Sequence, residues 1–185
     1  LAMCGSFCTY ARVLDAFRAL ADTKRYALVP IMSQASYETD SRFGCASAFR
    51  TQLEEICGHE IIHTIEAAEP IGPKKLLDAL VIAPCTGNTL SKLAAGIADG
   101  PVTLAAKAHL RNERPVILAV STNDGLAGNA ANLGALLNRR GYYFVPFGQD
   151  SAFKKPRSLV ADFTKLPETI GAALRGEQLQ PMLYA

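Results

Sequence analysis

Four short runs of apolar residues most narrowly limit the fold, because their hydrophobic residues are continuous rather than alternating with polar ones. They are YALVPIM at 26–32, DALVIAP at 78–84, PVILAV at 115–120 and YYFVPF at 142–147. Such runs are typical of strands buried on both faces, as in a parallel sheet covered by helices. Two weaker strands are predicted at 1–4 and 60–65. We therefore expect a parallel sheet of about six strands.

Amphipathic helical patterns lie between these strands. Apolar residues recur at helical spacing in 13–21, 49–57, 90–97, 130–137 and 166–174, and 100–112 predicts a further helix with Pro101 in its first turn. Alternating strands and helices predict a three-layer, doubly wound α/β fold of the Rossmann or flavodoxin-like kind. Without an internal repeat or linker, we expect one domain over 1–185. The opening LAMCGSF reads as the tail of a strand, so residues are expected to precede it.

Composition excludes several classes of protein. Apolar residues make up 49% and charged residues 19%, which is typical of a globular chain. A net charge of +2 gives no reason to expect a nucleic-acid partner, and no apolar run is long enough for a membrane span. The five irregularly spaced cysteines indicate free thiols in a reducing, cytoplasmic compartment. No metal site is expected, because His59, His63 and His109 lack ligand spacing with them.

Small and hydroxyl-bearing residues follow four of the predicted strands. They are Gly5 and Ser6 in GSF after the first, Ser33 after the second, most of CTGNT at 85–89, and Ser121 with its neighbour Asn123 in STNDG. Carboxyl ends of parallel strands share one edge of a sheet, where ligands bind. Helix caps are the alternative for each turn, and both roles can coexist. Because GxxxxGK[ST] and GxGxxG are absent, we expect a mononucleotide phosphate held by backbone N–H and hydroxyl groups.

The stretch APCTGNT at 83–89 is the centre of this predicted site. Pro84 ends the strand, and Gly87 is expected to let the backbone approach a flat ligand. Thr86, Asn88 and Thr89 offer hydrogen bonds while capping the next helix. Cys85 has no base or cation beside it, so a packed residue is favoured over a reactive thiol.

The longer phrase APCTGNTLSKLAAGIADG at 83–100 resembles the PASANT-type motif of the homo-oligomeric FMN-containing cysteine decarboxylase and prenyltransferase flavoproteins. GSF at 5–7 and Ser33 are similar to the phosphate-side loops of that family, and the likeness covers about residues 1–150. The resemblance implies FMN and a homo-oligomer built from trimers. It assigns the flavin to the residues Gly5, Ser6, Phe7, Ser33, Pro84, Cys85, Thr86, Asn88, Thr89, Ser121 and Asn123.

Further phrases resemble one branch of this superfamily, a subunit of an enzyme of sporulating bacteria. They are GSFCTY, RFG, AEPIGPK, AAKAHLRN, PVILAVSTNDGL and VPFGQD. The resemblance implies oxidation of a dihydropyridine dicarboxylate in the mother-cell cytoplasm, with a partner subunit that binds NAD(P). The alternatives are an independent FMN-dependent decarboxylase and a non-catalytic partner of that subunit. Decarboxylation is not carried over, because VSTN at 120–123 replaces PAMN and His63 is expected to be a core or edge histidine.

A dicarboxylate substrate requires fixed cations, and two loops offer them. Arg42 in SRFG and Lys155 in FKKPRS are the predicted substrate-binding residues. Glu69 in AEPIGP is the predicted acid or base, and Asn88 is the second predicted catalytic residue. The segment 146–158 is predicted to be a mobile lid over the substrate, with a solvated surface loop as the alternative.

Overall fold

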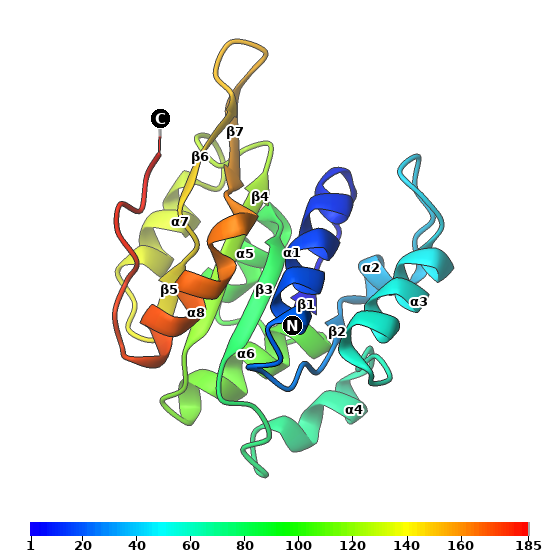
Figure 1. The fold of residues 1–185 in the computed structure, drawn as a ribbon. Coiled ribbons are helices and arrows are strands. Elements are labelled where there is room, and N and C mark those ends of the chain that lie inside the picture. Colours follow the sequence, from blue (N-terminus) through cyan, green and yellow to red (C-terminus); the bar gives the residue numbers. More distant parts are fainter. Residues whose placement is uncertain (185) are drawn as a thin grey trace.

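The computed structural model describes residues 1–184 and has a central sheet with helices on both faces (Figure 1). The sheet order is β2-β1-β3-β4-β7-β6, with β5 also paired to β4. The strands are β1 (Ala2–Met3), β2 (Ile31–Met32), β3 (Leu80–Cys85), β4 (Val116–Thr122), β5 (Tyr142–Phe144), β6 (Phe147–Ser151) and β7 (Lys155–Ala161). The first five strands pair in parallel, as the continuous apolar runs predict.

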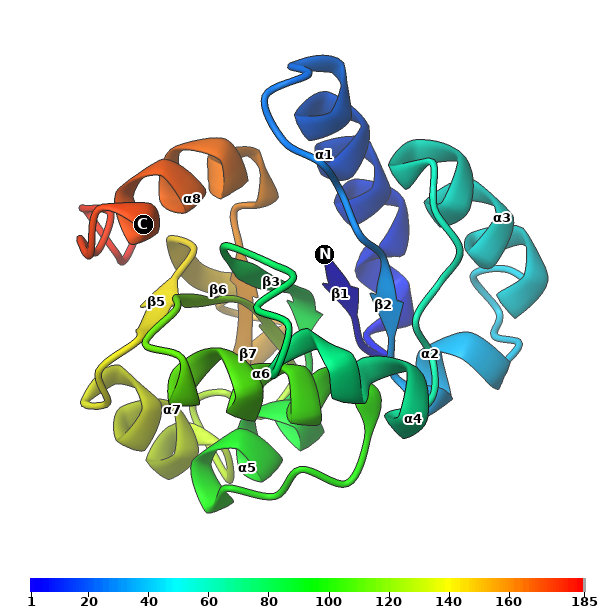
Figure 2. The same cartoon turned by 90° about the horizontal axis from the view of Figure 1, so that it is seen from below.

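The predicted helices are all present and form the two outer layers. They are α1 (Tyr10–Asp22), α3 (Ala46–Cys57), α5 (Gly87–Ala95), α6 (Pro101–Arg111), α7 (Ala130–Leu137) and α8 (Leu166–Leu174). Figure 2 shows α1 and α8 on one face of the sheet and α5, α6 and α7 on the other. The helix expected over 90–97 ends at Ala95, because Gly96 takes a left-handed conformation (φ 73°) that caps it.

The edge of the sheet beyond β1 has less strand than expected. Only Ile31 and Met32 of the run 26–32 form a strand, and the prediction of a strand over 60–65 is wrong. There Ile62 makes a single parallel bridge to Ile31, and helix α4 (Ile65–Ala68) begins three residues later. Thr64 caps α4 by accepting a hydrogen bond from the Ala67 N–H, which favours a helix at this point.

The other end of the sheet has more strand than expected. The run 142–147 divides at Val145 and Pro146, so β5 ends at Phe144 and β6 starts at Phe147. The segment 146–158, predicted as a lid or a surface loop, lies mostly in a β6–β7 hairpin that pairs antiparallel with the end of β4. The sheet is therefore mixed and has seven strands rather than six parallel ones.

Two stretches that lie outside the predicted strands and helices contain short helices. Within 33–45 lies α2 (Gln34–Glu38), and within 67–77 lie the end of α4 and the 3-10 turn η2 (Glu69–Ile71). Two more 3-10 turns, η1 (Phe7–Thr9) and η3 (Phe163–Lys165), precede α1 and α8.

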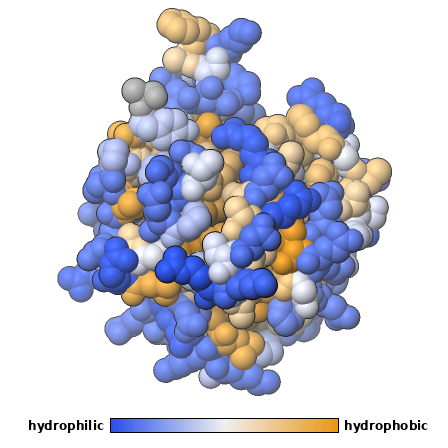
Figure 3. Space-filling model, viewed as in Figure 1, coloured by the Kyte–Doolittle hydropathy of each residue, from blue (hydrophilic) through white to orange (hydrophobic). Residues whose placement is uncertain are grey.

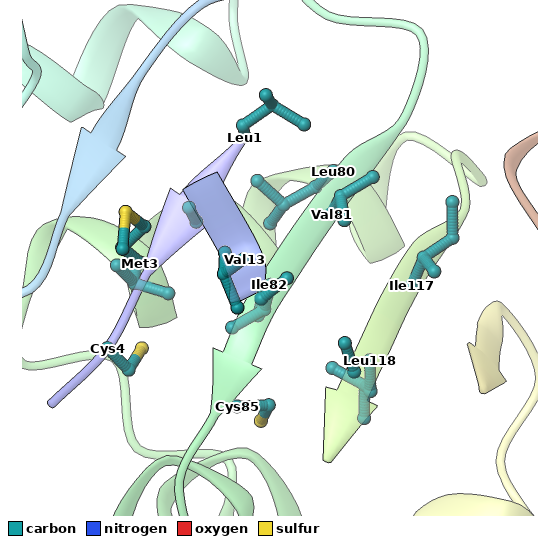
Figure 4. Close-up of a cluster of buried hydrophobic side chains, with 14 of the residues drawn as sticks. Leu1, Met3, Cys4, Val13, Leu80, Val81, Ile82, Cys85, Ile117 and Leu118 are labelled. Carbon is teal, nitrogen blue, oxygen red and sulfur yellow. The ribbon is translucent and has the colours of Figure 1, made fainter. Parts of the chain in front are cut away.

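The core surrounds β3 and β4, whose residues are buried along almost their whole length. In Figure 4, Leu80 and Ile82 of β3 lie among side chains from β1, β4 and α1. The face of the molecule seen in Figure 3 is mainly hydrophilic, with scattered apolar residues. Among residues 1–184, no helix is long and apolar enough to cross a membrane.

Candidate functional site at the carboxyl edge of the sheet

The strand order creates one place where the chain reverses its direction of winding. From β1 the chain moves outward to β2, whereas from β3 it moves the opposite way to β4 and β5. This is the flavodoxin-like order 2-1-3-4-5, with its reversal between β1 and β3. Ligands of open α/β sheets bind beyond the carboxyl ends of the strands at such a point. Gly5 follows β1 and Thr86 follows β3 there.

Two cavities open at this edge, and both are lined by Gly5 and Thr86. The larger edge cavity has a volume of about 700 Å³ and is also lined by Ser33, Asn88 and Thr89. The smaller edge cavity has a volume of about 260 Å³ and lies under the β6–β7 hairpin. Its lining includes Ser6, Arg12, Ser121, Asn123 and Lys155. The polar strand ends predicted from the sequence therefore come together.

In the larger edge cavity, the residues that cap the helices also form part of the cavity wall. Thr86 caps α5: its Oγ1 accepts a hydrogen bond of 3.2 Å from the Thr89 N–H and lies 3.0 Å from the Thr89 hydroxyl. Ser33 caps α2 by accepting a 3.3 Å hydrogen bond from the Ser36 N–H. The first N–H groups of α5 have no carbonyl partner within the helix, so this end carries a partial positive charge. Because Thr86, Asn88 and Thr89 at this end line the cavity, the positive end of α5 faces it.

The loop after β4 contains a network of polar side chains, and Ser91 of α5 joins it by donating to Asn129 Oδ1 at 2.9 Å. Thr122 Oγ1 donates to Asp124 Oδ1 at 2.5 Å, and Asn129 Nδ2 donates to Asp124 Oδ2 at 2.8 Å. These hydrogen bonds, that from Thr122 first, lower the pKa of Asp124. A Cβ on Gly87 would lie 2.5 Å from Asn129 Nδ2 and 2.6 Å from Thr122 Oγ1. Close packing against this loop, rather than room for a flat ligand, therefore requires glycine at position 87.

Two residues that line the larger edge cavity, His63 and Lys92, were not among the residues predicted for the site. The ring of His63 lines the larger edge cavity and stacks on Tyr37, with the ring centroids 3.8 Å apart and the planes at 10°. Lys92 lines the same cavity and pairs with Asp99, with the Nζ–Oδ2 distance at 2.8 Å. Lys92 follows Asn88 by four positions, so helical periodicity alone could have placed both side chains on one face.

Comparisons with known proteins agree with this geometry. The flavoprotein family model matches residues 1–147. The B subunit of dipicolinate synthase from Bacillus subtilis is 46% identical over 179 residues, covering 97% of this chain and 89% of that protein. The chain belongs to the flavoprotein family, in its group of dipicolinate synthase B subunits.

Solved structures of this flavoprotein family have the same fold. The crystal structure of the dipicolinate synthase B subunit from Bacillus halodurans C superposes with a TM-score of 0.90 at 43% identity, covering 100% of this chain and 94% of that one. The FMN-dependent cysteine decarboxylase SpaF gives a TM-score of 0.66 at 25% identity, covering 94% and 93%. The family resemblance and the mainly parallel α/β fold expected from the sequence are confirmed.

Three of the residues predicted to bind flavin line neither edge cavity. Cys85 is fully buried at the end of β3, and burial raises the pKa of its thiol well above the usual value. Pro84 beside it is also buried. The ring of Phe7 packs on that of Tyr10, with the centroids 5.2 Å apart. Cys85 and Pro84 thus belong to the core rather than to the cavity lining.

Two predicted chemical roles are not supported by the position of the residues. Glu69 begins η2, is exposed, and lines neither edge cavity. Arg42 lies in the exposed loop between α2 and α3, with its guanidinium 4.9 Å from the ring of Phe43. Lys155, by contrast, lines the smaller edge cavity, where its Nζ lies 2.5 Å from Asp150 Oδ2.

Proposed function

We propose that the chain is the flavin-binding B subunit of a dipicolinate synthase, with FMN in the larger edge cavity. One observation carries the proposal: the cavity opens where the flavodoxin-like strand order reverses, between β1 and β3. That reversal is where flavodoxin-like sheets bind FMN. The similarity to B subunits of dipicolinate synthase and to an FMN-dependent decarboxylase supports the same ligand.

The residues at the reversal suit a phosphate group. The positive end of α5, the Thr86 and Thr89 hydroxyls and the Ser33 hydroxyl lie around one cavity. Helix N-termini bind phosphate through free N–H groups and the helix dipole, so a lysine is not required. Lys92 forms an ion pair with Asp99, so we assign it to the cavity wall rather than to phosphate binding. Asn88, whose side chain is exposed to the cavity, would orient the ring end of the flavin.

The reaction we infer is the removal of a hydride and a proton from a dihydropyridine dicarboxylate. A bound flavin, or NAD(P) on the partner A subunit of the synthase, supplies the hydride acceptor. The protein's part is to hold the substrate ring beside that acceptor and to exclude water from it. Glu69 lines neither edge cavity, so we do not retain it as the proton acceptor. A homo-oligomer built from trimers and a cytoplasmic location complete the proposal.

Ser33 offers a clean test of the phosphate site, because Asp and Asn cap a helix as well as Ser does. Ser33→Asp keeps the cap of α2 and adds a negative charge to the larger edge cavity. It should weaken FMN binding about tenfold or more, measured by flavin fluorescence, since a unit charge this close costs over ~1 kcal/mol. The neutral Ser33→Asn variant is the matched control and should bind FMN nearly as the unchanged chain does. Equal affinities for all three proteins would place the phosphate elsewhere.

The catalytic proposal is tested by reconstitution. This chain, its partner from the synthase and the mixture of the two are assayed for dipicolinate formation with and without FMN. Dipicolinate formed only by the mixture, and faster with FMN, supports a redox role for the chain. Full activity of the mixture without flavin would make the chain a non-catalytic partner. Flavin-dependent loss of CO₂ by the chain alone would make it an independent decarboxylase.

A further inference from the structure

The smaller edge cavity differs in chemistry from the larger one beside it. It lies between the start of α1, the end of β4 and the β6–β7 hairpin. Hydroxyl groups from four segments line it: Ser6, Thr9, Thr86, Ser121, Thr122 and Ser158. Its volume of about 260 Å³ is just below the range of roughly 300–1,000 Å³ typical of small-molecule sites, so it suits one small ring rather than a nucleotide.

The charges in the smaller edge cavity leave one cation without a partner. Arg12, Lys155 and Asp150 are its charged lining residues. Asp150 is paired with Lys155 at 2.5 Å, whereas the side chain of Arg12 makes no hydrogen bond or ion pair to any of residues 1–184. The Arg12 guanidinium instead lies 5.3 Å from the centre of the Phe163 ring. Stacking on an aromatic ring holds a guanidinium in place and leaves its N–H donors available.

Arg12 therefore has the properties that a carboxylate-binding residue needs. Its planar fork can bind a carboxylate through two parallel hydrogen bonds, which are stronger than those between neutral groups. The hydroxyl groups of Ser6 and Ser121 are hydrogen-bonded to each other at 2.8 Å, so one donates to the other. The O–H of the accepting serine is left to donate to a second polar group of the same ligand. Since the smaller and larger edge cavities share Gly5 and Thr86, a ring in the smaller one would lie beside the contents of the larger one.

From this geometry we infer that the smaller edge cavity is a subsite for a small planar dicarboxylate, with Arg12 as its principal carboxylate-binding residue. The inference rests on the proposed function for the identity of the ligand, but not for the presence of an anion subsite. Lys155 binds the second carboxylate, in exchange with Asp150. Arg12 thus takes the role that the sequence assigned to Arg42.

Binding of pyridine-2,6-dicarboxylate, followed by calorimetry with FMN present, tests the subsite. Arg12→Gln should weaken binding about tenfold or more, because a charge-assisted hydrogen-bond pair is lost. Arg12→Lys keeps the positive charge but lacks the planar fork. Its affinity should therefore fall between those of the unchanged chain and Arg12→Gln. Arg18→Gln is the matched control: Arg18 lies on the same helix, is exposed and pairs with Asp15 away from the cavity. It should leave affinity unchanged.

Three outcomes contradict the subsite. They are the absence of saturable binding by the unchanged chain, equal affinities for Arg12→Gln and Arg18→Gln, and equal affinity for benzoate and the dicarboxylate.

An FMN titration of the same variants separates this inference from the proposed function. Normal FMN binding with no Arg12-dependent dicarboxylate binding defeats only the subsite. Arg12-dependent binding without any FMN binding leaves the subsite in place and defeats the flavin assignment.

Discussion

The hydroxyl oxygens of Ser6 and Ser121 lie 2.8 Å apart, although 115 positions separate the two residues in the chain. Ser6 follows β1 and Ser121 lies near the end of β4, so their contact spans the end of β3, which lies between those strands. Ser121 is buried and its hydroxyl also reaches Thr9 Oγ1 at 3.4 Å. This link holds together the two sides of the smaller edge cavity.

Removing either hydroxyl should therefore destabilise the chain modestly. We expect Ser121→Ala to lower the free energy of unfolding by about 1 kcal/mol, because a buried hydrogen-bonded hydroxyl is lost. Ser6→Ala should cost less, since Ser6 is only partly buried. Urea unfolding of both single variants and the double variant gives the coupling energy. Strictly additive losses would show that the contact contributes nothing.

Gly87 should not tolerate even a methyl group. A Cβ there would lie within 3 Å of Asn129, Thr122 and Asp124, so Gly87→Ala must displace the loop after β4. We expect a loss of about 1–3 kcal/mol in unfolding free energy, typical of overpacking.

Gly134 is the control for this glycine. It lies within α7, and a Cβ there would meet no atom within 4 Å. Gly134→Ala should stabilise the chain by up to about 1 kcal/mol, because alanine favours the helix. Similar effects of the two substitutions on urea unfolding would contradict the packing argument.

Stability should fall in acid because of His109. This residue of α6 is buried, its Nδ1 has no hydrogen-bond partner among residues 1–184, and burial is the main cause that lowers its pKa from 6.5 to about 4. The unfolded chain then binds a proton at a higher pH than the folded chain does. The stabilising contribution is therefore complete above pH 6.5 and is lost as pH falls from 6.5 toward 4, at up to about 1.4 kcal/mol per pH unit.

Substitution separates His109 from other acid-sensitive groups. His109→Gln should flatten the dependence of thermal stability on pH between 6.5 and 4, whatever its effect at neutral pH. His59 is exposed, so His59→Gln should leave the dependence unchanged. An unaltered slope in the His109 variant would show that other groups cause the acid sensitivity.

The cysteines should react with alkylating reagents in an order set by burial. Cys8 and Cys45 are exposed, whereas Cys4 and Cys85 are buried. Burial raises the pKa of Cys4 to about 11 and that of Cys85 well above its usual value. Iodoacetamide should therefore modify Cys8 and Cys45 of the folded chain first, as read by peptide mass spectrometry. Early modification of Cys85 would mean that this thiol is accessible after all.

The central sheet was predictable because burial on both faces leaves continuous apolar runs, as in Leu80–Cys85. Short strands were harder: Ile31 and Met32 pair at the sheet edge, and the bridge at Ile62 depends on tertiary neighbours rather than on a local pattern. The β6–β7 hairpin was missed because polar residues such as Gln149 and Asp150 interrupt it and it pairs with the end of β4 only in the folded chain.

The residues of the candidate site also differ in whether local sequence alone could place them. Ser33, Thr86 and Thr89 could be placed because strand ends converge and caps have a local sequence signature. Arg12 could not, since it is one of two exposed cations on α1, with Arg18, and only the fold brings it under the hairpin. Glu69 and Arg42 were chosen for their loop phrases, and a loop's sequence does not fix which edge of the sheet it meets.

A crystal structure of the chain grown with FMN would locate the cofactor. We expect flavin density in the larger edge cavity, with the phosphate against Ser33 and the Thr86–Thr89 turn at the start of α5. A third cavity, of about 840 Å³ and lined by Lys107, Arg140 and Tyr142 among others, offers cations and aromatic rings away from that edge. Flavin bound there, or no flavin at saturating concentration, would contradict the assignment of the β1–β3 reversal as the cofactor site.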